Sequence, residues 1–169
     1  RRSADSGRGG EGAGELTILI DADGCPVVDI TLETARRYAV PVILLCDSAH
    51  VFSREGAQTV TVSTGADSVD FALVNRVRPG DIVVTQDYGL AAMCLAKGAV
   101  PLHQDGFVYH EGNMDALLAA RHMAKTIRRR GGRLRGSSRR RPEQDEAYRR
   151  LLEEILHTRT ERQLPEQKM

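Results

Sequence analysis

Residues 80–102 read GDIVVTQDYGLAAMCLAKGAVPL, and this stretch indicates the architecture of the chain. The apolar run Ile82–Thr85 is typical of a buried strand. Leu90–Lys97 is expected to form a helix capped by Gly98, and Val100–Leu102 to form a second strand. A strand, a helix and a strand in this order make a crossover unit, which places the two strands parallel in one sheet.

The same alternation continues on both sides of this unit. We expect further strands over Leu16–Ile20, Val42–Cys46 and Thr59–Val62, and helices over Val27–Ala39, Asp67–Val77, about Met114–Arg130 and about Glu143–His157. The chain has no Trp and few other aromatic residues, so its core must be built mainly from Val, Ile, Leu and Ala. That composition is common in parallel sheets covered on both faces. The sequence therefore predicts an α/β fold of three layers, with a mostly parallel central sheet flanked by helices.

The length of 169 residues suits one domain with tails. Residues 1–15 are rich in Gly, Ser and charge and are expected to be a disordered tail. Residues 16–157 are expected to form the domain, including a basic C-terminal helix and linker, and residues 158–169 a flexible tail. The three cysteines form no C-x-x-C pair, which argues against disulfides and structural zinc. With no membrane-length apolar run, a cytoplasmic protein without a membrane partner is expected, whereas a homo-oligomer is left open.

Charge is separated along the chain. Residues 16–120 contain 13 Asp and Glu against 6 Lys and Arg, whereas residues 121–169 contain 15 basic and 7 acidic residues. An acidic body with a basic C-terminal part suits a metal-dependent enzyme that acts on a polyanion, because carboxylates hold cations and Arg binds phosphates. The alternative is that the basic stretch is only a solvated, flexible segment.

Acidic residues follow the expected strands where each strand ends. Asp21 and Asp23 follow the first strand, Asp67 and Asp70 the third, and Asp87 the fourth. The carboxyl ends of parallel strands meet at one edge of a sheet, so these side chains are expected to lie close together. Mg²⁺ or Mn²⁺ would hold them ionised, since both prefer oxygen ligands. Taken singly, Asp67 and Asp87 could instead cap helices.

Three segments resemble one bacterial family, the YaiI/YqxD family. They are IDADGCPV at residues 20–27, GADSVDFALVNRVRPGDIVVTQDYGLAAMCLAKGA at residues 65–99 and RHMAKTIRRRGGRLRG at residues 121–136, and the resemblance extends from Leu16 to about Leu152. That family is placed by similarity among PIN-like domains, which implies a PIN-like fold. The basic stretch Ser137–Arg141 departs from the family, where a Gly-Pro-Lys-like stretch is usual.

The resemblance also implies a function, because typical PIN nucleases use an Asp after the first strand, acids on a central helix and an Asp after a V-x-T-x-D strand. Asp21, Asp70 and Asp87 match these positions as catalytic metal ligands, with Asp23 and Asp67 as additional ligands. The activity implied is metal-dependent hydrolysis of phosphodiester bonds, with RNA ahead of DNA as substrate. Two sets of residues would support it: Thr85 and Asn75 as hydrogen-bond partners of the ligands, and Arg128, Arg129, Arg130 and Arg133 as contacts to the nucleic-acid backbone.

Other readings stay open. The chain could be a catalytically inactive module that binds nucleic acid or a protein. The start IDADG also resembles the D-x-D-G motif of haloacid-dehalogenase-like phosphatases, but Gly80-Asp81 precede their strand and Lys97 follows it, which reverses the order in that family. Cys25 could be a nucleophile, although a small apolar role suits it better because no His lies near it in sequence.

Overall fold

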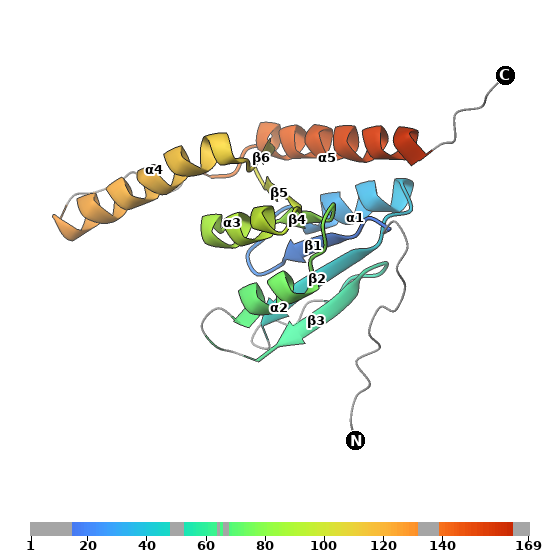
Figure 1. Ribbon diagram of the computed structural model, residues 1–169, viewed down its shortest axis with the longest axis horizontal. Helices are drawn as coiled ribbons and strands as arrows, with labels where there is room; N and C mark the ends of the chain where they lie inside the picture. The colour runs from blue at the N-terminus through green and yellow to red at the C-terminus, as the bar shows by residue number, and fades with distance from the viewer. Residues whose placement is uncertain (1–14, 48–52, 64, 66–67, 132–138, 164–169) are drawn as a thin grey trace.

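The computed structural model describes residues 15–47, 53–63, 65, 68–131 and 139–163. Its strands form one sheet in the order β3-β2-β1-β4-β5-β6 (Figure 1). The strands are β1 Ile18–Asp21, β2 Val42–Asp47, β3 Gln58–Val62, β4 Ile82–Val84, β5 Val100–His103 and β6 Phe107–Val108. The helices are α1 Val28–Arg37, α2 Ser68–Arg76, α3 Tyr88–Ala96, α4 Glu111–Arg129 and α5 Pro142–Gln163. Strands β1 to β5 are parallel, which confirms the predicted α/β architecture.

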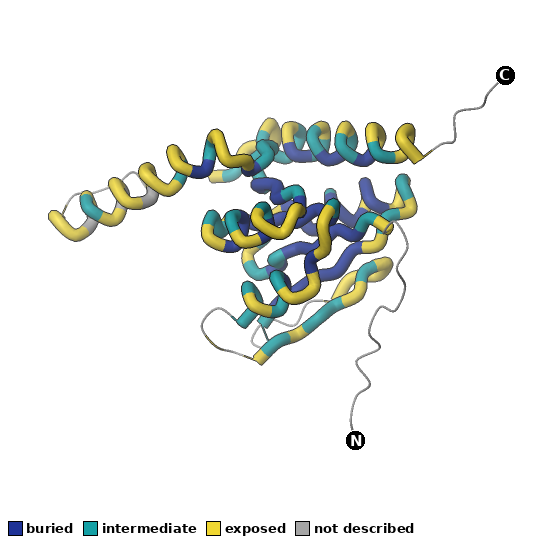
Figure 2. The backbone as a smooth tube through the Cα atoms, in the orientation of Figure 1, coloured by how far each residue is buried: buried dark blue, intermediate teal, exposed yellow. Residues whose placement is uncertain are grey.

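The sheet is covered on both faces, and its central strands β1, β2 and β4 are apolar at every position except the Asp that ends β1 and β2. Ile18 and Ile20 of β1 face one core, which α1 and α5 close, whereas Leu19 faces a second core closed by α2 and α3. Successive side chains of a strand point to opposite faces, so a run of large aliphatic residues supplies both cores. The buried residues accordingly follow the sheet and the inner sides of the helices (Figure 2).

The structure differs from the sequence-based expectation after β5. Strand β6 is antiparallel to β5 and was not expected, since two residues are too short to give a periodic signal. Gly106 closes the turn between them with φ +92°, and a Cβ there would lie 2.7 Å from the backbone carbon of Ala147 in α5. The hairpin therefore sits directly against the start of α5.

The two ends of the domain also differ from the expectation. The first strand begins at Ile18 rather than Leu16, and α5 continues to Gln163, so residues 158–163, expected in a flexible tail, are helical. Burial of Leu152 and Leu156 against the sheet anchors this helix beyond what its local sequence indicates. The expected tail at residues 1–14 lies outside the described residues. Within the part that is described, no helix is both long enough and apolar enough to cross a lipid bilayer.

Candidate acidic site

The carboxyl ends of the parallel strands carry a group of acidic side chains around Asp21. Asp21 is the last residue of β1, Asp70 lies in the first turn of α2, and Asp87 directly precedes α3. The pKa of Asp21 is raised to about 6, mainly by burial, with smaller contributions from the negative charges of Asp70, Asp23 and Asp87; a hydrogen bond from Thr85 acts in the opposite direction. Three of the other four predicted carboxylates are therefore close enough to act on Asp21.

Thr85 joins two of these acids. Its hydroxyl donates to Oδ2 of Asp21 at 3.0 Å and accepts from the backbone N–H of Asp87 at 3.0 Å. Thr85 is almost fully buried, and it follows β4, the strand beside β1. The hydroxyl thus joins the ends of two adjacent strands, while the role of Thr85 as a hydrogen-bond partner of metal ligands stays a prediction.

Asp87 also caps α3. Its Oδ1 accepts from the backbone N–H of Gly89 at 2.9 Å and of Leu90 at 3.2 Å. The capping role considered from sequence is therefore real for Asp87, and one carboxylate oxygen is committed to it. Oδ2 takes part in neither bond, so capping and cation binding are compatible at this residue.

Asp23 connects the ends of β1 and β2. Its Oδ2 accepts from the backbone N–H of Asp47 at 3.0 Å, and its Oδ1 is buried. The carboxylate therefore spans the gap between two strand ends and is held by the backbone. Asp23 thus has a structural role as well as a place in the acidic group.

The ligand set stays a prediction. Within the described residues, no group of three or more His, Cys, Asp or Glu is arranged so that it could hold a metal ion. Asp67 lies outside the described residues, so the predicted set cannot be seen whole. The donors are all carboxylates at an edge with excess negative charge, which fits Mg²⁺ or Mn²⁺ in chemistry.

The structure does not bring Asn75 to this group. Asn75 is exposed near the C-terminal end of α2, whereas Asp70 is in the first turn of the same helix. The helix advances by about 1.5 Å per residue, so it carries Asn75 away from the acidic edge. The sequence could have indicated this, because the two residues are more than one turn apart.

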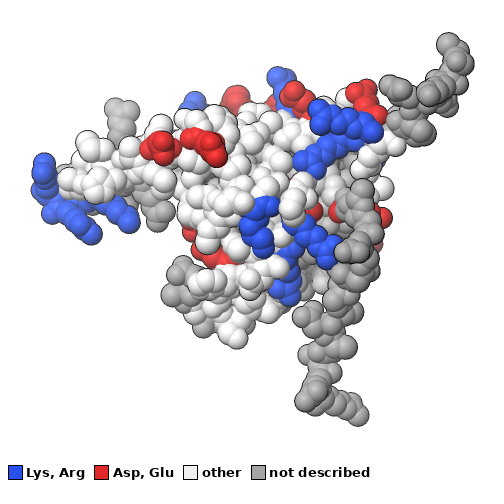
Figure 3. All heavy atoms as spheres, in the orientation of Figure 1, with Lys and Arg blue, Asp and Glu red and all other residues white. Residues whose placement is uncertain are grey.

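The basic residues predicted to contact nucleic acid fall at the outer end of α4. Arg129 and Arg130 are exposed there, while Arg133 and the side chain of Arg128 lie outside what the structure describes. Helix α4 projects from the body toward the side to which the strands point, and Lys and Arg gather at its end (Figures 1 and 3). Acidic and basic regions are thus on the same side of the molecule.

Arg140, which sequence analysis groups with this basic stretch, has a different role. Its guanidinium donates to Asp145 at 2.6 Å, to Asp105 at 2.8 Å and to the carbonyl of Gln104 at 2.7 Å. These bonds tie the β5–β6 turn to the first turn of α5. Its donors are used inside the protein, so Arg140 is a structural residue and does not belong to a phosphate-binding cluster.

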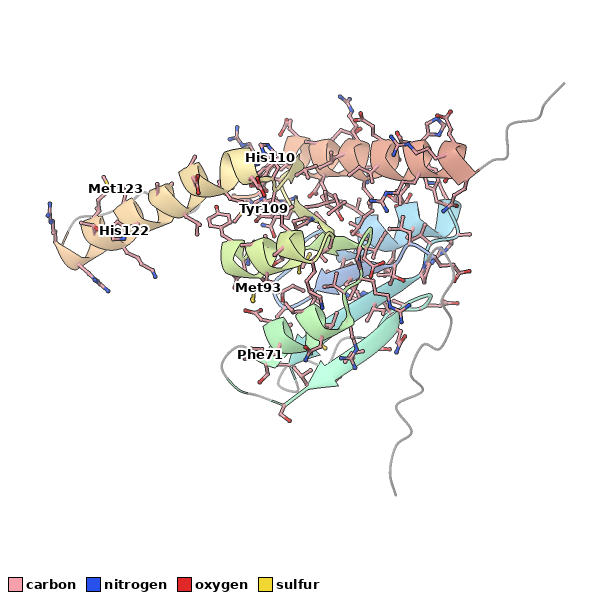
Figure 4. The ribbon with its side chains drawn as sticks, viewed as in Figure 1. Phe71, Met93, Tyr109, His110, His122 and Met123 are labelled. Atoms are coloured by element: carbon pink, nitrogen blue, oxygen red, sulfur yellow. The ribbon has the colours of Figure 1, made fainter. Side chains whose placement is uncertain are left out.

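Two further side chains bear on function. Burial raises the pKa of Cys25 to about 11, so the thiol is protonated at neutral pH and the role of nucleophile is not supported. Phe71, which sequence analysis did not single out, is 64% exposed and adjoins Asp70 on α2 (Figure 4). The helical spacing could have indicated this exposure. Leu73 is buried in α2, and Phe71, two residues before it, lies on the opposite side of the helix.

The phosphatase reading fails in the structure as well. Asp81 is buried before β4, where its carboxylate accepts from the backbone N–H groups of Thr17 at 3.1 Å and Arg78 at 2.9 Å. It therefore lies at the edge where the strands begin, opposite Asp21 at the end of β1. The Gly80-Asp81 pair cannot share a site with the first acidic residue.

The sequence matches one known protein family. The family described as "Uncharacterized BCR, YaiI/YqxD family" matches residues 19–158. The chain belongs to the YaiI/YqxD family. Its match contains every acidic residue of the candidate site, so the site lies within the family's common region.

Relatives of this family cover most of the chain. A UPF0178 protein of Exiguobacterium sibiricum is 49% identical over 146 residues, covering 86% of this chain and 100% of the relative. A UPF0178 protein of Ruminiclostridium cellulolyticum is 47% identical, covering 81% and 90%, and one of Natranaerobius thermophilus is 43% identical, covering 83% and 96%. The names of these relatives state no activity.

A solved structure gives a looser likeness. Rae1 (YacP) from Bacillus subtilis, crystallised as a W164L mutant, aligns with 85% of this chain and 99% of its own at 12% identity and a TM-score of 0.38. A likeness of this degree decides neither fold nor function. The fold is therefore described by its strand order, and the candidate site by its acidic residues.

Proposed function

We propose that this YaiI/YqxD-family protein is a PIN-like, metal-dependent nuclease that hydrolyses phosphodiester bonds in the cytoplasm, with RNA ahead of DNA as substrate. The observation that supports it is the raised pKa of Asp21 beside Asp23, Asp70 and Asp87. Neighbouring carboxylates repel one another, so this arrangement lowers the stability of the fold. Side chains with strongly shifted pKa values concentrate at functional sites.

The proposal gives each acid a task. Asp21, Asp70 and Asp87 would hold Mg²⁺ or Mn²⁺, with Asp23 and Asp67 as further ligands or as acceptors that orient a water molecule. The bound cation would supply a water of lowered pKa and stabilise the charge on the phosphate. Thr85 would keep Asp21 and the backbone of Asp87 at a fixed separation, which a shared cation requires.

Two features support a nucleic-acid substrate, and the second favours a single strand. Arg129 ends α4, which projects toward the side to which the strands point (Figure 1), and Arg130 follows it; both are exposed and would contact phosphates. The exposed ring of Phe71 adjoins Asp70, where a base unstacked from its neighbours could stack on it. A base in a duplex is not available for such stacking, so single-stranded RNA fits better than duplex.

A catalytically inactive nucleic-acid-binding module is the second candidate. It is favoured by the capping role of Asp87 and by the lack of a ready three-ligand group within the described residues. In that case the acidic edge would have no part in turnover, and the basic residues would supply the affinity.

The deciding experiment compares cleavage and binding of single-stranded RNA in variants with and without Mn²⁺. Asp21→Asn, Asp70→Asn and Asp87→Asn each remove one charge, and Asn at position 87 can still cap α3. The control is Asp29→Asn, an exposed acid on α1 whose partner is Arg54. If the protein is a nuclease, we expect Mn²⁺-dependent cleavage that falls at least about 100-fold in each of the three variants. Loss of a residue that only hydrogen-bonds to a metal ligand already lowers metal affinity or activity by about 10- to 100-fold.

The alternatives give distinct results. RNA binding that survives all three substitutions, without cleavage in any protein, would identify the binding module. Cleavage that persists equally with EDTA, or that is unchanged in Asp21→Asn, would contradict the proposed site.

A further inference from the structure

Two adjoining hollows lie along the second half of α5. The first, the α5 hollow, has a volume of about 400 Å³ and lies between α5 and the strands β5 and β6. The second, the Gly80 hollow, has a volume of about 380 Å³ and lies beside the turn that precedes β4. Arg159 and Arg162 line both, so the hollows meet at these two side chains. They lie on the side where the strands begin (Figure 1), and the acidic site is at the opposite edge.

The walls of the α5 hollow are largely aliphatic. Four residues at the margin of the core closed by α1 and α5 line it and remain partly exposed: Val100, Val108, Leu151 and Ile155. Small-molecule sites typically have volumes of about 300–1,000 Å³ and apolar walls with a few polar groups. The α5 hollow has this character, and an apolar ligand group would be removed from water there.

The polar groups of the α5 hollow include two arginines on one side of α5. Arg159 and Arg162 are three residues apart, a spacing at which like charges face each other on a helix. Arg159 donates to the carbonyl of Gly80, which uses one of the five N–H donors of its guanidinium. Arg162 is exposed and makes no hydrogen bond or ion pair with any residue that the structure describes. Both guanidinium groups therefore have donors that a ligand can use.

Nearby acids do not balance the two arginines. Asp81 accepts with both carboxylate oxygens from backbone N–H groups, as described above, and Glu154 is the acid that lines the α5 hollow. The pKa of Arg159 is lowered, mainly by burial and further by the charge of Arg162, whereas Asp81 acts in the opposite direction. An anion placed between the arginines would relieve their repulsion.

The start of the chain does not suit the aliphatic walls. Residues 1–14 contain no Val, Ile, Leu, Met or aromatic residue, so they offer no large apolar side chain. An occupant needs both an apolar body for the four aliphatic residues and a negative charge for the arginines. The planar guanidinium matches the geometry of a carboxylate and of a phosphate equally well.

We propose that the α5 hollow binds a small amphipathic anion, a molecule in which a carboxylate or phosphate group is attached to an apolar body. The anionic group lies between Arg159 and Arg162, and the apolar body lies against Val100, Val108, Leu151 and Ile155. The site is separate from the acidic edge, so the proposal does not rest on nuclease activity.

Calorimetric titration of the whole chain, in EDTA and without RNA, tests the proposal with four probes. Octanoate and octyl phosphate carry both a charge and an apolar chain, 1-octanol has the chain alone, and inorganic phosphate has the charge alone. We expect octanoate or octyl phosphate to bind at least about 10-fold more tightly than either of the last two, which each lose one kind of contact. The tighter of the first two identifies the anionic group.

Two variants separate the charge from the apolar wall. Arg162→Gln should weaken binding of the tighter anionic probe at least about 10-fold and leave 1-octanol unchanged. Val108→Thr should weaken the anionic probe and 1-octanol alike, because it places a hydroxyl in the apolar wall. The control is Arg150→Gln, which removes the same charge from an α5 residue that pairs with Glu146 and lines neither hollow.

Thermal unfolding checks that the variants are folded. Arg150 and Arg162 are exposed, so both arginine variants should melt close to the wild type. The proposal is overturned if neither octanoate nor octyl phosphate binds at millimolar concentration, or if 1-octanol or inorganic phosphate binds as tightly as they do. An equal loss of affinity in Arg150→Gln and Arg162→Gln also overturns it, because net charge would then explain the binding.

Discussion

Thr85 donates its hydroxyl hydrogen to Oδ2 of Asp21 at 3.0 Å, which joins the residue that follows β4 to the last residue of β1. The hydroxyl oxygen of Thr85 also accepts from the backbone N–H of Asp87, so the donor direction of the hydroxyl is fixed. Asp21 at the end of β1 and Asp87 after the neighbouring strand β4 are thereby joined through one buried side chain. The central part of the acidic edge is consequently rigid before any cation arrives.

Replacing Thr85 tests this link. Thr85→Val keeps the shape but removes the hydroxyl, leaving Asp21 and the N–H of Asp87 without that partner. We expect the unfolding free energy to fall by about 1–3 kcal/mol and Mn²⁺ affinity to fall about 10-fold or more. Thr85→Ser keeps the hydroxyl and is the control, so it should retain most of the unfolding free energy and most of the Mn²⁺ affinity. Calorimetric Mn²⁺ titration and urea unfolding measure the two effects, and equal behaviour of Val and Ser would contradict the link.

Asp21 should make the metal-free protein less stable as pH rises. Its pKa is raised from 3.8 to about 6 in the folded state, so between these values the folded protein holds a proton that the unfolded chain has lost. The contribution is present below about pH 4 and lost as pH rises through about 6. Asp21→Asn should remove this slope and be more stable at neutral pH, by on the order of 1–2 kcal/mol.

Urea unfolding in EDTA measures the pH effect as the difference between wild type and Asp21→Asn, which cancels the titration of other groups. A difference that does not grow between about pH 4 and pH 7 would show that Asp21 is not perturbed. Saturating Mn²⁺ should reverse the order of stability, because a cation bound to the carboxylate stabilises the wild type.

The fold followed from sequence where the signal was long and periodic. The apolar runs around Ile18, Val42 and Ile82 predicted three buried parallel strands, since only a sheet covered on both faces accepts such residues at every position. Strand β6 was missed because its pairing depends on Gly106 and the contact of the turn with α5, which are tertiary effects. The end of α5 was misplaced for the same reason.

The site was predictable only in part. Strand ends located Asp21 and Asp87, because topology alone brings the ends of parallel strands together. Sequence could not assign Arg140, since its partner Asp105 is 35 residues away and belongs to a turn that was not predicted. Nor could the sequence show that Asp87 both caps α3 and lies near Asp21, because only the hydrogen bonds in the structure reveal this.

Arg140 should matter for stability, unlike its neighbour. Arg140→Gln removes charged hydrogen bonds to Asp105 and Asp145, and we expect the unfolding free energy to fall by about 2 kcal/mol. Arg139→Gln, an exposed position, should change it by less than about 0.5 kcal/mol. Urea unfolding of both variants tests this, and equal stability would place Arg140 back among the surface cations.

Phe71 should contribute to binding of single-stranded RNA and not to folding. Phe71→Ala should weaken binding by about 1–3 kcal/mol, the usual value of one stacked base, while Phe71→Tyr retains it. Met93→Ala on α3 is the control, because Met93 is also exposed, at 41%, without an aromatic face. Fluorescence anisotropy with labelled RNA, using a duplex of the same sequence for comparison, measures this. A loss equal for duplex and single strand would contradict stacking.

The end of α4 should supply salt-dependent affinity for RNA. Arg129 and Arg130 are exposed beyond the acidic body, and binding of arginine to phosphates releases counterions. Arg129→Gln with Arg130→Gln should therefore weaken binding to every RNA sequence alike and flatten the dependence of log affinity on log salt, by about 0.7 for each phosphate that the variant no longer binds. Including Arg128→Gln should extend the effect, if that residue also binds the RNA backbone.

The matched control is Arg149→Gln with Arg150→Gln on α5, which removes the same charge from residues that pair with Glu146. Binding is measured by anisotropy over a salt series. If both pairs of substitutions weaken binding equally without changing the slope, net charge alone attracts the RNA and α4 does not touch it directly. A flatter slope only for the α4 variant would place phosphates at its basic end, because the number of released counterions is set by how many phosphates the protein neutralises locally.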